Sequence, residues 1–277
     1  MMKNTIYTFI ISLFLFSACD KIEMPYAQED TSFFEDNFPP LNYSSVYRKI
    51  LIEEYTGHRC TNCPAGHIKL VELSALFGDT LVPICIHATE LAKPVGSLYS
   101  YDFRTSEGTE LSNDFGINPI PAAVVNRTKF SGNNWALVGE EKWYNVIKNA
   151  NRHVYAGIQI MTEEEASRVL KINTKTTMLE TYNSPLQVSI FLIEDNIIKP
   201  QLNGTEPDTL YQHNHVFRTS LNGTYGTKIN LAKDSAFLKG YYLDFKGKDW
   251  NIKNVSVVVI LHDPATREVL QVEVKKQ

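Results

Sequence analysis

The sequence predicts two folded units in series, an α/β domain over residues 46–153 and an all-β sandwich over residues 154–277. In the first unit, apolar runs alternate with segments of helical period, which is typical of α/β domains. The second unit consists of short runs rich in β-branched and aromatic residues, with turn signals between them. A chain of 277 residues is long enough for two domains of average size.

The N-terminal segment predicts an exported, membrane-anchored chain. Residues 1–18 begin with a charge and continue with an apolar stretch too short to span a bilayer, as signal peptides do. Residues 15–19, Leu-Phe-Ser-Ala-Cys, resemble a bacterial lipobox, with a phenylalanine where a small or aliphatic residue is usual. The resemblance implies that Cys19 is lipidated; the alternative is a secretory peptide cleaved near Ala18. Residues 19–45 are polar and predict a linker.

Composition excludes several classes of function. The net charge is -4 without blocks of like charge, so we expect no nucleic-acid partner. No glycine-rich dinucleotide fingerprint is present, and we expect no cofactor. The four cysteines are too few for a disulfide-stapled scaffold, and only Cys60 and Cys63 lie close together in sequence. Cys85 lies in an apolar run and is expected to be an inert core thiol.

The α/β unit is predicted from a strand, a helix and a second strand. Residues 49–52 form an apolar run typical of a buried strand. Residues 64–77 carry a helix-like apolar stripe that ends at Gly78, and residues 81–87 predict another buried strand. The stripe comprises Ile68, Val71, Leu73, Leu76 and Phe77. A loop-rich insertion is expected over residues 88–109 and a short helix over 110–115. A turn over 116–121 then leads into a strand over 122–125, and a last helix covers 139–152.

The second unit predicts an antiparallel sandwich of the immunoglobulin-like kind. Two of its runs, at residues 186–190 and 270–274, alternate strictly between apolar and polar side chains, as half-buried strands do. The expected strands cover residues 156–161, 169–177, 186–193, 215–221, 227–231, 241–245, 255–262 and 269–274.

Cys60 and Cys63 form a C-x-x-C pair between the first predicted strand and the first predicted helix. A helix N-terminus carries a partial positive charge and stabilises a thiolate there, and His58 and Arg59 are expected to add positive charge. The pair also suits zinc, which wants two further ligands. His58 and His67 are close in sequence, but there is no second C-x-x-C, so redox chemistry is favoured.

Residues 46–152 resemble a thioredoxin-fold domain. The resemblance rests on the strand before Cys60-Thr-Asn-Cys-Pro, on Glu54 six residues before the first cysteine, and on the loop that ends in Ile120-Pro121. It implies that an exposed Cys60 attacks a partner disulfide and that a less exposed Cys63 resolves the mixed disulfide. It further implies a buried Glu54 that moves a proton, and a cis Pro121 that places the backbone of Ile120 beside the sulfurs. The alternative for Glu54 is a surface carboxylate.

The arrangement as a whole is similar to the outer-membrane-protein-twenty-eight-related lipoproteins of the Bacteroidetes group. Residues 54–66 and 211–218 are the most specific parts of this likeness. It implies an outer-membrane lipoprotein anchored at Cys19, on either face. We expect thiol–disulfide exchange on protein substrates, with a second redox protein that resets the pair. The rival hypothesis is a surface-exposed binding or adhesion lipoprotein in which Cys60–Cys63 is a structural disulfide.

Overall fold

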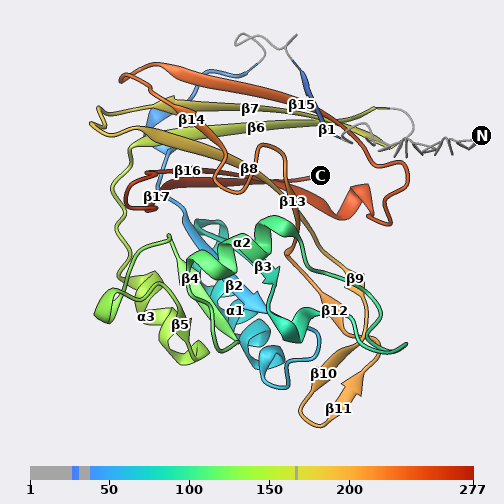
Figure 1. Cartoon of the computed structure of the whole chain (residues 1–277). Coiled ribbons are helices and arrows are strands. Elements are labelled where there is room, and N and C mark those ends of the chain that lie inside the picture. Colours follow the sequence, from blue (N-terminus) through green and yellow to red (C-terminus); the bar gives the residue numbers. More distant parts are fainter. Residues whose placement is uncertain (1–26, 31–37, 166–167) are drawn as a thin grey trace, which may run out of the picture.

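The computed structural model describes residues 27–30, 38–165 and 168–277 and is built mainly from strands (Figure 1). Two large sheets and two short ladders hold the strands of these ranges. No helix in the described part of the chain is long and apolar enough to cross a membrane. The predicted signal peptide and Cys19 lie outside the described residues.

The larger sheet has nine strands and runs through both halves of the chain, in the order β17-β16-β8-β13-β3-β2-β4-β5, with β14 paired to β8. It is mixed, because β3 pairs in parallel with both β2 and β13, whereas β4 pairs antiparallel with β2. Its strands are β2 (Ile50–Thr56), β3 (Leu81–His87), β4 (Ala122–Val125), β5 (Leu137–Val138), β8 (Leu186–Glu194), β13 (Val216–Ser220), β14 (Thr227–Ile229), β16 (Val255–His262) and β17 (Val269–Lys276).

The second sheet is antiparallel, in the order β1-β15-β7-β6, and covers the C-terminal strands of the larger sheet (Figure 1). A core of aliphatic and aromatic side chains from β6, β7, β8, β15 and β16 fills the space between the two sheets. The strands of this sheet are β1 (Ala27–Asp30), β6 (Ala156–Glu165), β7 (Val169–Met178) and β15 (Ala236–Asp244). The strand β1 therefore lies within the segment predicted as a linker.

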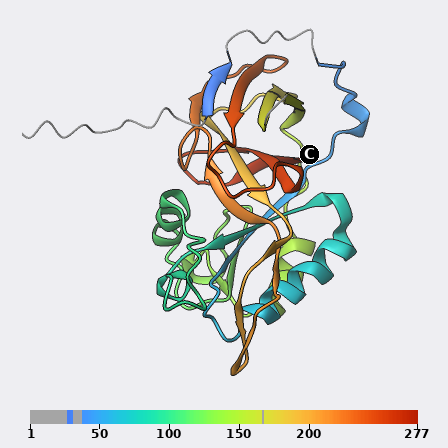
Figure 2. The same cartoon turned by 90° about the vertical axis from the view of Figure 1, so that its right-hand side faces the viewer.

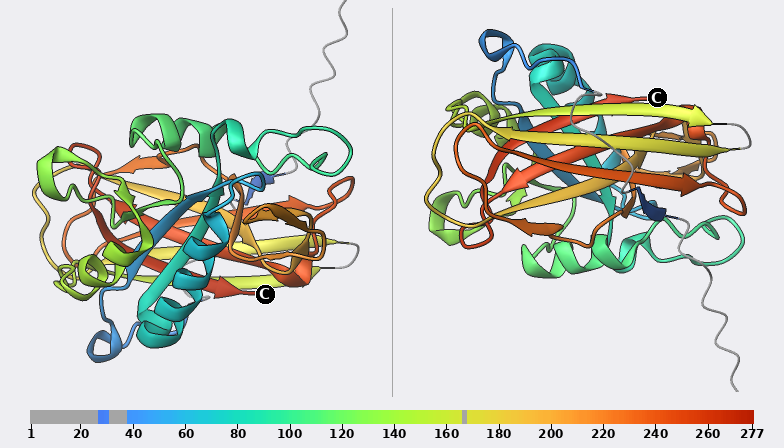
Figure 3. Two further views of the ribbon diagram at one scale, coloured as in Figure 1. Left: turned by 90° about the horizontal axis from the view of Figure 1, so that it is seen from below. Right: turned by 90° about the horizontal axis from the view of Figure 1, so that it is seen from above.

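Helices cover both faces of the β2–β3–β4 part of the larger sheet (Figure 3). On one face, α1 (Cys63–Phe77) and α3 (Trp143–Lys148) share a core with alternate residues of β2; on the other, α2 (Ser106–Asp114) does. The helix α1 buries Leu70 and Leu73, whereas Ile68 of the predicted stripe is 61% exposed. Short 3₁₀ turns are η2 (Tyr43–Ser45), η3 (Gly78–Thr80), η4 (Glu90–Ala92), η5 (Ser131–Asn133), η6 (Glu140–Lys142) and η7 (Ile252–Asn254).

Between β8 and β13 the chain leaves the sheet and returns, forming what we call the hairpin arm, residues 197–213. The arm consists of two antiparallel ladders, β9 with β12 and β10 with β11, and it extends past the end of α1 (Figure 2). Its strands are β9 (Ile197–Ile198), β10 (Gln201–Asn203), β11 (Glu206–Asp208) and β12 (Gln212–His213). The sequence indicates a turn here through Asn203-Gly204, but the arm itself was not predicted.

The predicted fold class, a thioredoxin-like α/β domain followed by a separate immunoglobulin-like sandwich, is wrong. The two halves share one sheet, because Val216 of β13 pairs with Cys85 of β3 and the Cys85 N–H donates to the His215 carbonyl at 2.7 Å. Adjacent runs of residues revealed the strands but not this pairing across 130 residues. The unit boundaries at residues 45–46 and 153–154 stay predictions.

Most individual elements lie near their predicted positions. The strand predicted over residues 122–125 is β4, and the strand predicted over residues 255–262 is β16. The helix predicted over residues 139–152 is shorter, since only η6 and α3 form within it. The short helix α2 begins four residues before its predicted start, where the Thr105 side chain accepts the N–H of Gly108 and caps it.

An ion pair is buried on the face of the sheet that α2 covers. Glu53 of β2 and Arg127, two residues after β4, are both fully buried, and Arg127 Nη2 lies 2.7 Å from Glu53 Oε1. The guanidinium also lies about 6 Å from the rings of Phe115, Phe191 and Tyr225. Removing one partner of such a pair typically costs about 3–5 kcal/mol, because the other charge stays buried alone.

The buried His262 should make stability depend on pH. Burial lowers the pKa of His262 to about 3, and its Nε2 lies 3.0 Å from the Tyr225 carbonyl oxygen. Below pH about 6.5 the unfolded chain binds a proton at this ring and the folded chain does not. Lowering the pH from about 6.5 towards 3 therefore reduces the free energy of unfolding by up to about 1.4 kcal/mol per pH unit. We expect His262→Gln to flatten this dependence in urea unfolding between pH 4.5 and 7.5. Equal slopes for the two proteins would contradict the assignment.

Candidate functional site

The disulfide between Cys60 and Cys63 lies where the loop after β2 meets α1. The S–S distance is 2.08 Å and the two Cα atoms are 5.4 Å apart. The helix begins at Cys63, with Pro64 in its first turn, where the missing N–H costs nothing. The structure therefore brings the two predicted cysteines together as an oxidised pair.

Cys60 is not exposed, contrary to the expectation from sequence. It is 3% exposed and Cys63 is 2% exposed. Cys60 precedes the first residue of α1, and the hairpin arm covers its loop. The Gln201 side-chain amide donates to the carbonyls of Gly57 at 3.3 Å and Cys60 at 3.1 Å, and the Leu202 N–H donates to the His58 carbonyl at 2.8 Å.

Gln201 and Leu202 were not predicted to cover the disulfide loop, because they lie 141 or more positions after the residues that they contact there. The turn signal at Asn203-Gly204 was the only local sign of them. Nothing in that signal indicates which distant loop the turn contacts.

The loop before β4 lies against the disulfide. The Ile120–Pro121 peptide bond is cis, as expected, and Asn118–Pro119 is cis as well. Cys60 Sγ lies 3.9 Å from the carbonyl oxygen of Ile120. Pro121 packs closely on α1, since a Cβ placed on Gly66 would lie 3.0 Å from Pro121 Cβ.

Glu54 is buried within the same region, on the α1 face of β2. It is 1% exposed, which excludes the surface alternative. Its Oε2 accepts a hydrogen bond from Cys85 Sγ at 3.2 Å, whereas its Oε1 has no partner among the described residues. Burial raises the pKa of Glu54 to about 7, although the bond from Cys85 acts in the opposite direction. Burial also raises the pKa of the Cys85 thiol well above its usual value.

His58 and Arg59 lie in the loop but are directed away from the role expected of them. His58 is 1% exposed and stacks on Tyr99 with ring centroids 5.4 Å apart. Burial, and then the charge of Arg59, lowers the pKa of His58 and favours a neutral ring. Arg59 Nε donates to the Lys93 carbonyl at 3.0 Å, and its Nη2 donates to the Glu90 carbonyl. The guanidinium thus binds the loop around η4.

A small cavity of about 10 Å³ lies behind the disulfide. His87 and His213, which the sequence did not connect to the site, line it together with Glu54 and Cys63. Burial lowers the pKa of His87 well below its usual value and that of His213 to about 3. The lining residues are Glu54, Thr56, Cys63, His67, Cys85, His87, Gln201, Tyr211, His213 and Asn214.

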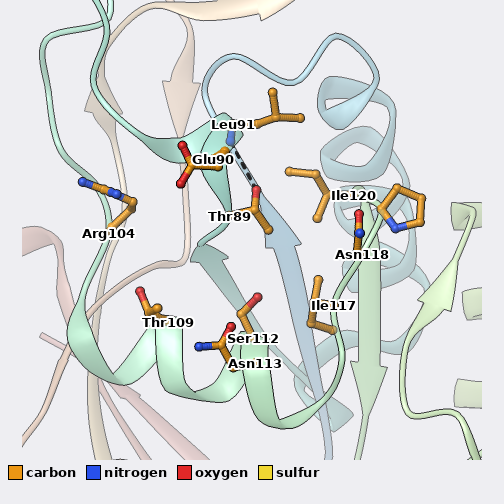
Figure 4. A pocket seen from close by; sticks show the side chains of 11 residues that line it. Thr89, Glu90, Leu91, Arg104, Thr109, Ser112, Asn113, Ile117, Asn118 and Ile120 are labelled. Atoms are coloured by element: carbon orange, nitrogen blue, oxygen red, sulfur yellow. Dashed lines mark hydrogen bonds between the residues drawn. The ribbon is translucent and has the colours of Figure 1, made fainter.

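A larger cavity of about 510 Å³ lies between α2, η4 and the loop that ends in Ile120 (Figure 4). Its size is that of typical small-ligand sites. Its walls combine apolar side chains such as Ile117 with the charged groups Glu90 and Arg104. Ile120 therefore takes part both in the wall of this cavity and, through its carbonyl oxygen, in the surroundings of Cys60 Sγ.

The close packing of the disulfide loop on η4 predicts that Gly57→Ala destabilises the chain. A Cβ at Gly57 would lie 2.7 Å from the backbone carbon of Leu91, which cannot move without shifting η4. Overpacking of this kind costs about 1–3 kcal/mol. Denaturant unfolding measures the loss, and Thr61→Ala, an exposed change in the same loop, should stay within about 0.5 kcal/mol of wild type. An unchanged free energy of unfolding in Gly57→Ala would contradict this prediction and show that η4 can shift without cost.

Comparisons with known proteins match this architecture. Residues 109–277 match the family model described as outer membrane protein Omp28. HBP35 of Porphyromonas gingivalis is similar over 84% of this chain and 76% of its own, at 16% identity and TM-score 0.67. A protein of Agrobacterium tumefaciens is similar over 84% and 96% of the two chains, at 12% identity and TM-score 0.50. At such identities these two likenesses show the fold alone.

A domain of the outer membrane lipoprotein Omp28 from Porphyromonas gingivalis has 23% identity over 44% of this chain and 88% of its own, with TM-score 0.33. The search of curated proteins gives no match. The Omp28 model, however, covers more than half of the chain. The chain therefore belongs to the outer membrane protein Omp28 family and is a lipid-anchored protein of the cell envelope, located in the outer membrane.

Proposed function

We propose that this outer-membrane lipoprotein performs thiol–disulfide exchange on protein substrates, with Cys60 and Cys63 as the reacting pair. One observation carries the proposal: Cys60 Sγ lies 3.9 Å from the carbonyl oxygen of Ile120, a residue that also lines the 510 Å³ cavity. A substrate segment that enters the cavity and extends along the backbone of Ile120 reaches the sulfur once the hairpin arm has moved. Cys19 supplies the predicted membrane anchor, and a second envelope redox protein resets the pair.

The exchange transfers two electrons without a cofactor. In the dithiol form, the Cys60 thiolate attacks a substrate disulfide, and one substrate sulfur leaves as a thiolate. The Cys63 thiolate then attacks Cys60 Sγ, which breaks the mixed disulfide and releases the second substrate sulfur. This closes the disulfide seen in the structure. The reverse sequence moves the disulfide to a substrate dithiol.

Glu54 is placed to exchange a proton with Cys63. Both residues line the cavity behind the disulfide, and Glu54 Oε1 has no other partner among the described residues. With a pKa of about 7, the carboxyl group holds or releases a proton near neutral pH, which is the range in which general acid–base catalysis is efficient. His58 is assigned no charge-bearing role, and Arg59 supports the loop through its bonds to the backbone around η4.

The proposal predicts that Cys63→Ser traps a mixed disulfide between Cys60 and a substrate protein. Without Cys63 the intermediate cannot be resolved, so adducts accumulate in the cell envelope. Non-reducing electrophoresis followed by mass spectrometry of the adducts checks this. Cys60→Ser is the matched control and should give none. Absence of adducts in Cys63→Ser, or equal adducts in both variants, would contradict exchange.

A second candidate function is that of a binding lipoprotein in which the disulfide is structural. The observation that favours it is the burial of both sulfurs beneath the hairpin arm. Exchange requires the arm to move, because a substrate sulfur has to approach Cys60 along the S–S axis. A structural disulfide has no such requirement. The two candidates therefore differ in how the arm controls access.

Under the exchange hypothesis, Gln201→Ala should speed reduction of the disulfide by a small dithiol. The change removes the amide that bonds to the carbonyls of Gly57 and Cys60, and each bond contributes about 1 kcal/mol, so we expect a rise of roughly fivefold or more. Gln212→Ala, at an exposed position of the same arm, is the control. Thiol titration after timed reduction gives the rates. Reduction that occurs only with global unfolding in all three proteins would support the structural disulfide instead.

A further inference from the structure

Three potential metal ligands converge behind the disulfide. A carboxylate oxygen of Glu54, a ring nitrogen of His67 and the sulfur of Cys85 all lie within 4.8 Å of one another. They come from three elements that are packed together: Glu54 and Cys85 are direct partners in the β2–β3 register, and α1 packs on β3. Ligands held on strands and a helix keep their geometry better than ligands on loops.

A second observation is that two buried polar side chains at this cavity have atoms without hydrogen-bond partners. Glu54 is 1% exposed and its Oε1 has no hydrogen-bond partner among the described residues. His87 lines the same cavity, is 3% exposed, and neither of its ring nitrogens has a partner there. Burying polar groups without partners is costly, so native structures rarely keep two at one cavity without a bound group.

The size of the cavity and the types of donor select the class of ligand. A volume of about 10 Å³ admits an ion or about one water molecule, and no organic ligand. The donors are one sulfur, one nitrogen and one oxygen, which suits Zn²⁺ and excludes Mg²⁺ and Ca²⁺, since those ions prefer oxygen ligands.

The separation of the sulfur and the carboxylate oxygen is also close to that in a tetrahedral site. In such a site, with Zn–S about 2.3 Å and Zn–O about 2.0 Å, the sulfur and oxygen lie roughly 3.5 Å apart. Cys85 Sγ and Glu54 Oε2 are 3.2 Å apart.

We propose that Glu54, His67 and Cys85 bind a divalent cation of the Zn²⁺ class. Cys85 loses its thiol proton to solvent on binding, and the hydrogen bond that it donates to Glu54 is replaced by two metal–ligand bonds. His87 lines the same cavity beside the three ligands. The site does not use the C-x-x-C sulfurs and does not depend on the proposed exchange reaction.

Co²⁺ titration of the purified full chain with its disulfide intact tests the proposal. Co²⁺ occupies zinc sites and absorbs in the near ultraviolet when a thiolate binds it. We expect a saturable charge-transfer band that Zn²⁺ displaces. Cys85→Ser should abolish the band, and His67→Gln should weaken Co²⁺ binding by about tenfold or more, the scale on which supporting contacts alone act. The control is His153→Gln, at an exposed histidine paired with Glu180, which should leave both unchanged.

Absence of saturable Co²⁺ and Zn²⁺ binding overturns the proposal, and so does a band that persists in Cys85→Ser. Should Cys85→Ser fail to fold, His67→Gln decides, because His67 is only half-buried on α1. An unchanged Co²⁺ affinity in that variant also overturns the site. Trapping of mixed disulfides by Cys63→Ser is read from protein adducts and does not report metal binding, so failure of the metal site and failure of the exchange function are separate results.

Discussion

The pairing of β13 with β3 is the interaction on which the rest of the structure depends. It rests on one parallel register position, Val216 opposite Cys85, and on the hydrogen bond from the Cys85 N–H to the His215 carbonyl. Because β13 also pairs with β8, this contact joins the helix-covered strands to the two-sheet half in one sheet. It also fixes where the hairpin arm returns, since the arm ends just before β13. The cover of the disulfide thus follows from a strand pairing made elsewhere.

Two neighbouring carboxylates on β2 show how the two faces of the sheet differ. Side chains alternate along a strand, so Glu53 faces the α2 side with Leu51 and Tyr55, and Glu54 faces the α1 side with Ile52. Glu53 pairs with the guanidinium of the buried Arg127. Glu54 Oε2 accepts a hydrogen bond from the Cys85 thiol, and its Oε1 has no hydrogen-bond partner among the described residues. The costly burial of Glu54 thus lies on the face of the sheet that carries the disulfide and the histidines.

The sequence predicted the local elements and the centre of the site well, because each rests on adjacent residues. The period of apolar side chains locates β4 and β16, and the C-x-x-C locates the start of α1 within three residues. The features that the sequence did not predict depend on contacts between segments that are distant in sequence. The contact of Val216 with Cys85 and the bonds of Gln201 to the disulfide loop join segments more than 130 residues apart. The buried face of α1 was misjudged because apolar residues occur all around it, and Leu70 and Leu73, rather than Ile68, face the sheet.

The strand β1 has a consequence for how the molecule sits on its membrane. Only seven residues lie between Cys19 and Ala27, the first residue of β1, and the eight Cα-to-Cα steps of a fully extended chain there span at most about 28 Å. A lipid on Cys19 would therefore be joined by a short linker to β1, which the β1–β15 ladder holds in the four-stranded sheet. In Figure 1, β1 lies at the top of the molecule, and the hairpin arm with the disulfide loop lies at the bottom. With such an anchor, the disulfide loop would lie at the end of the body that is away from the lipid.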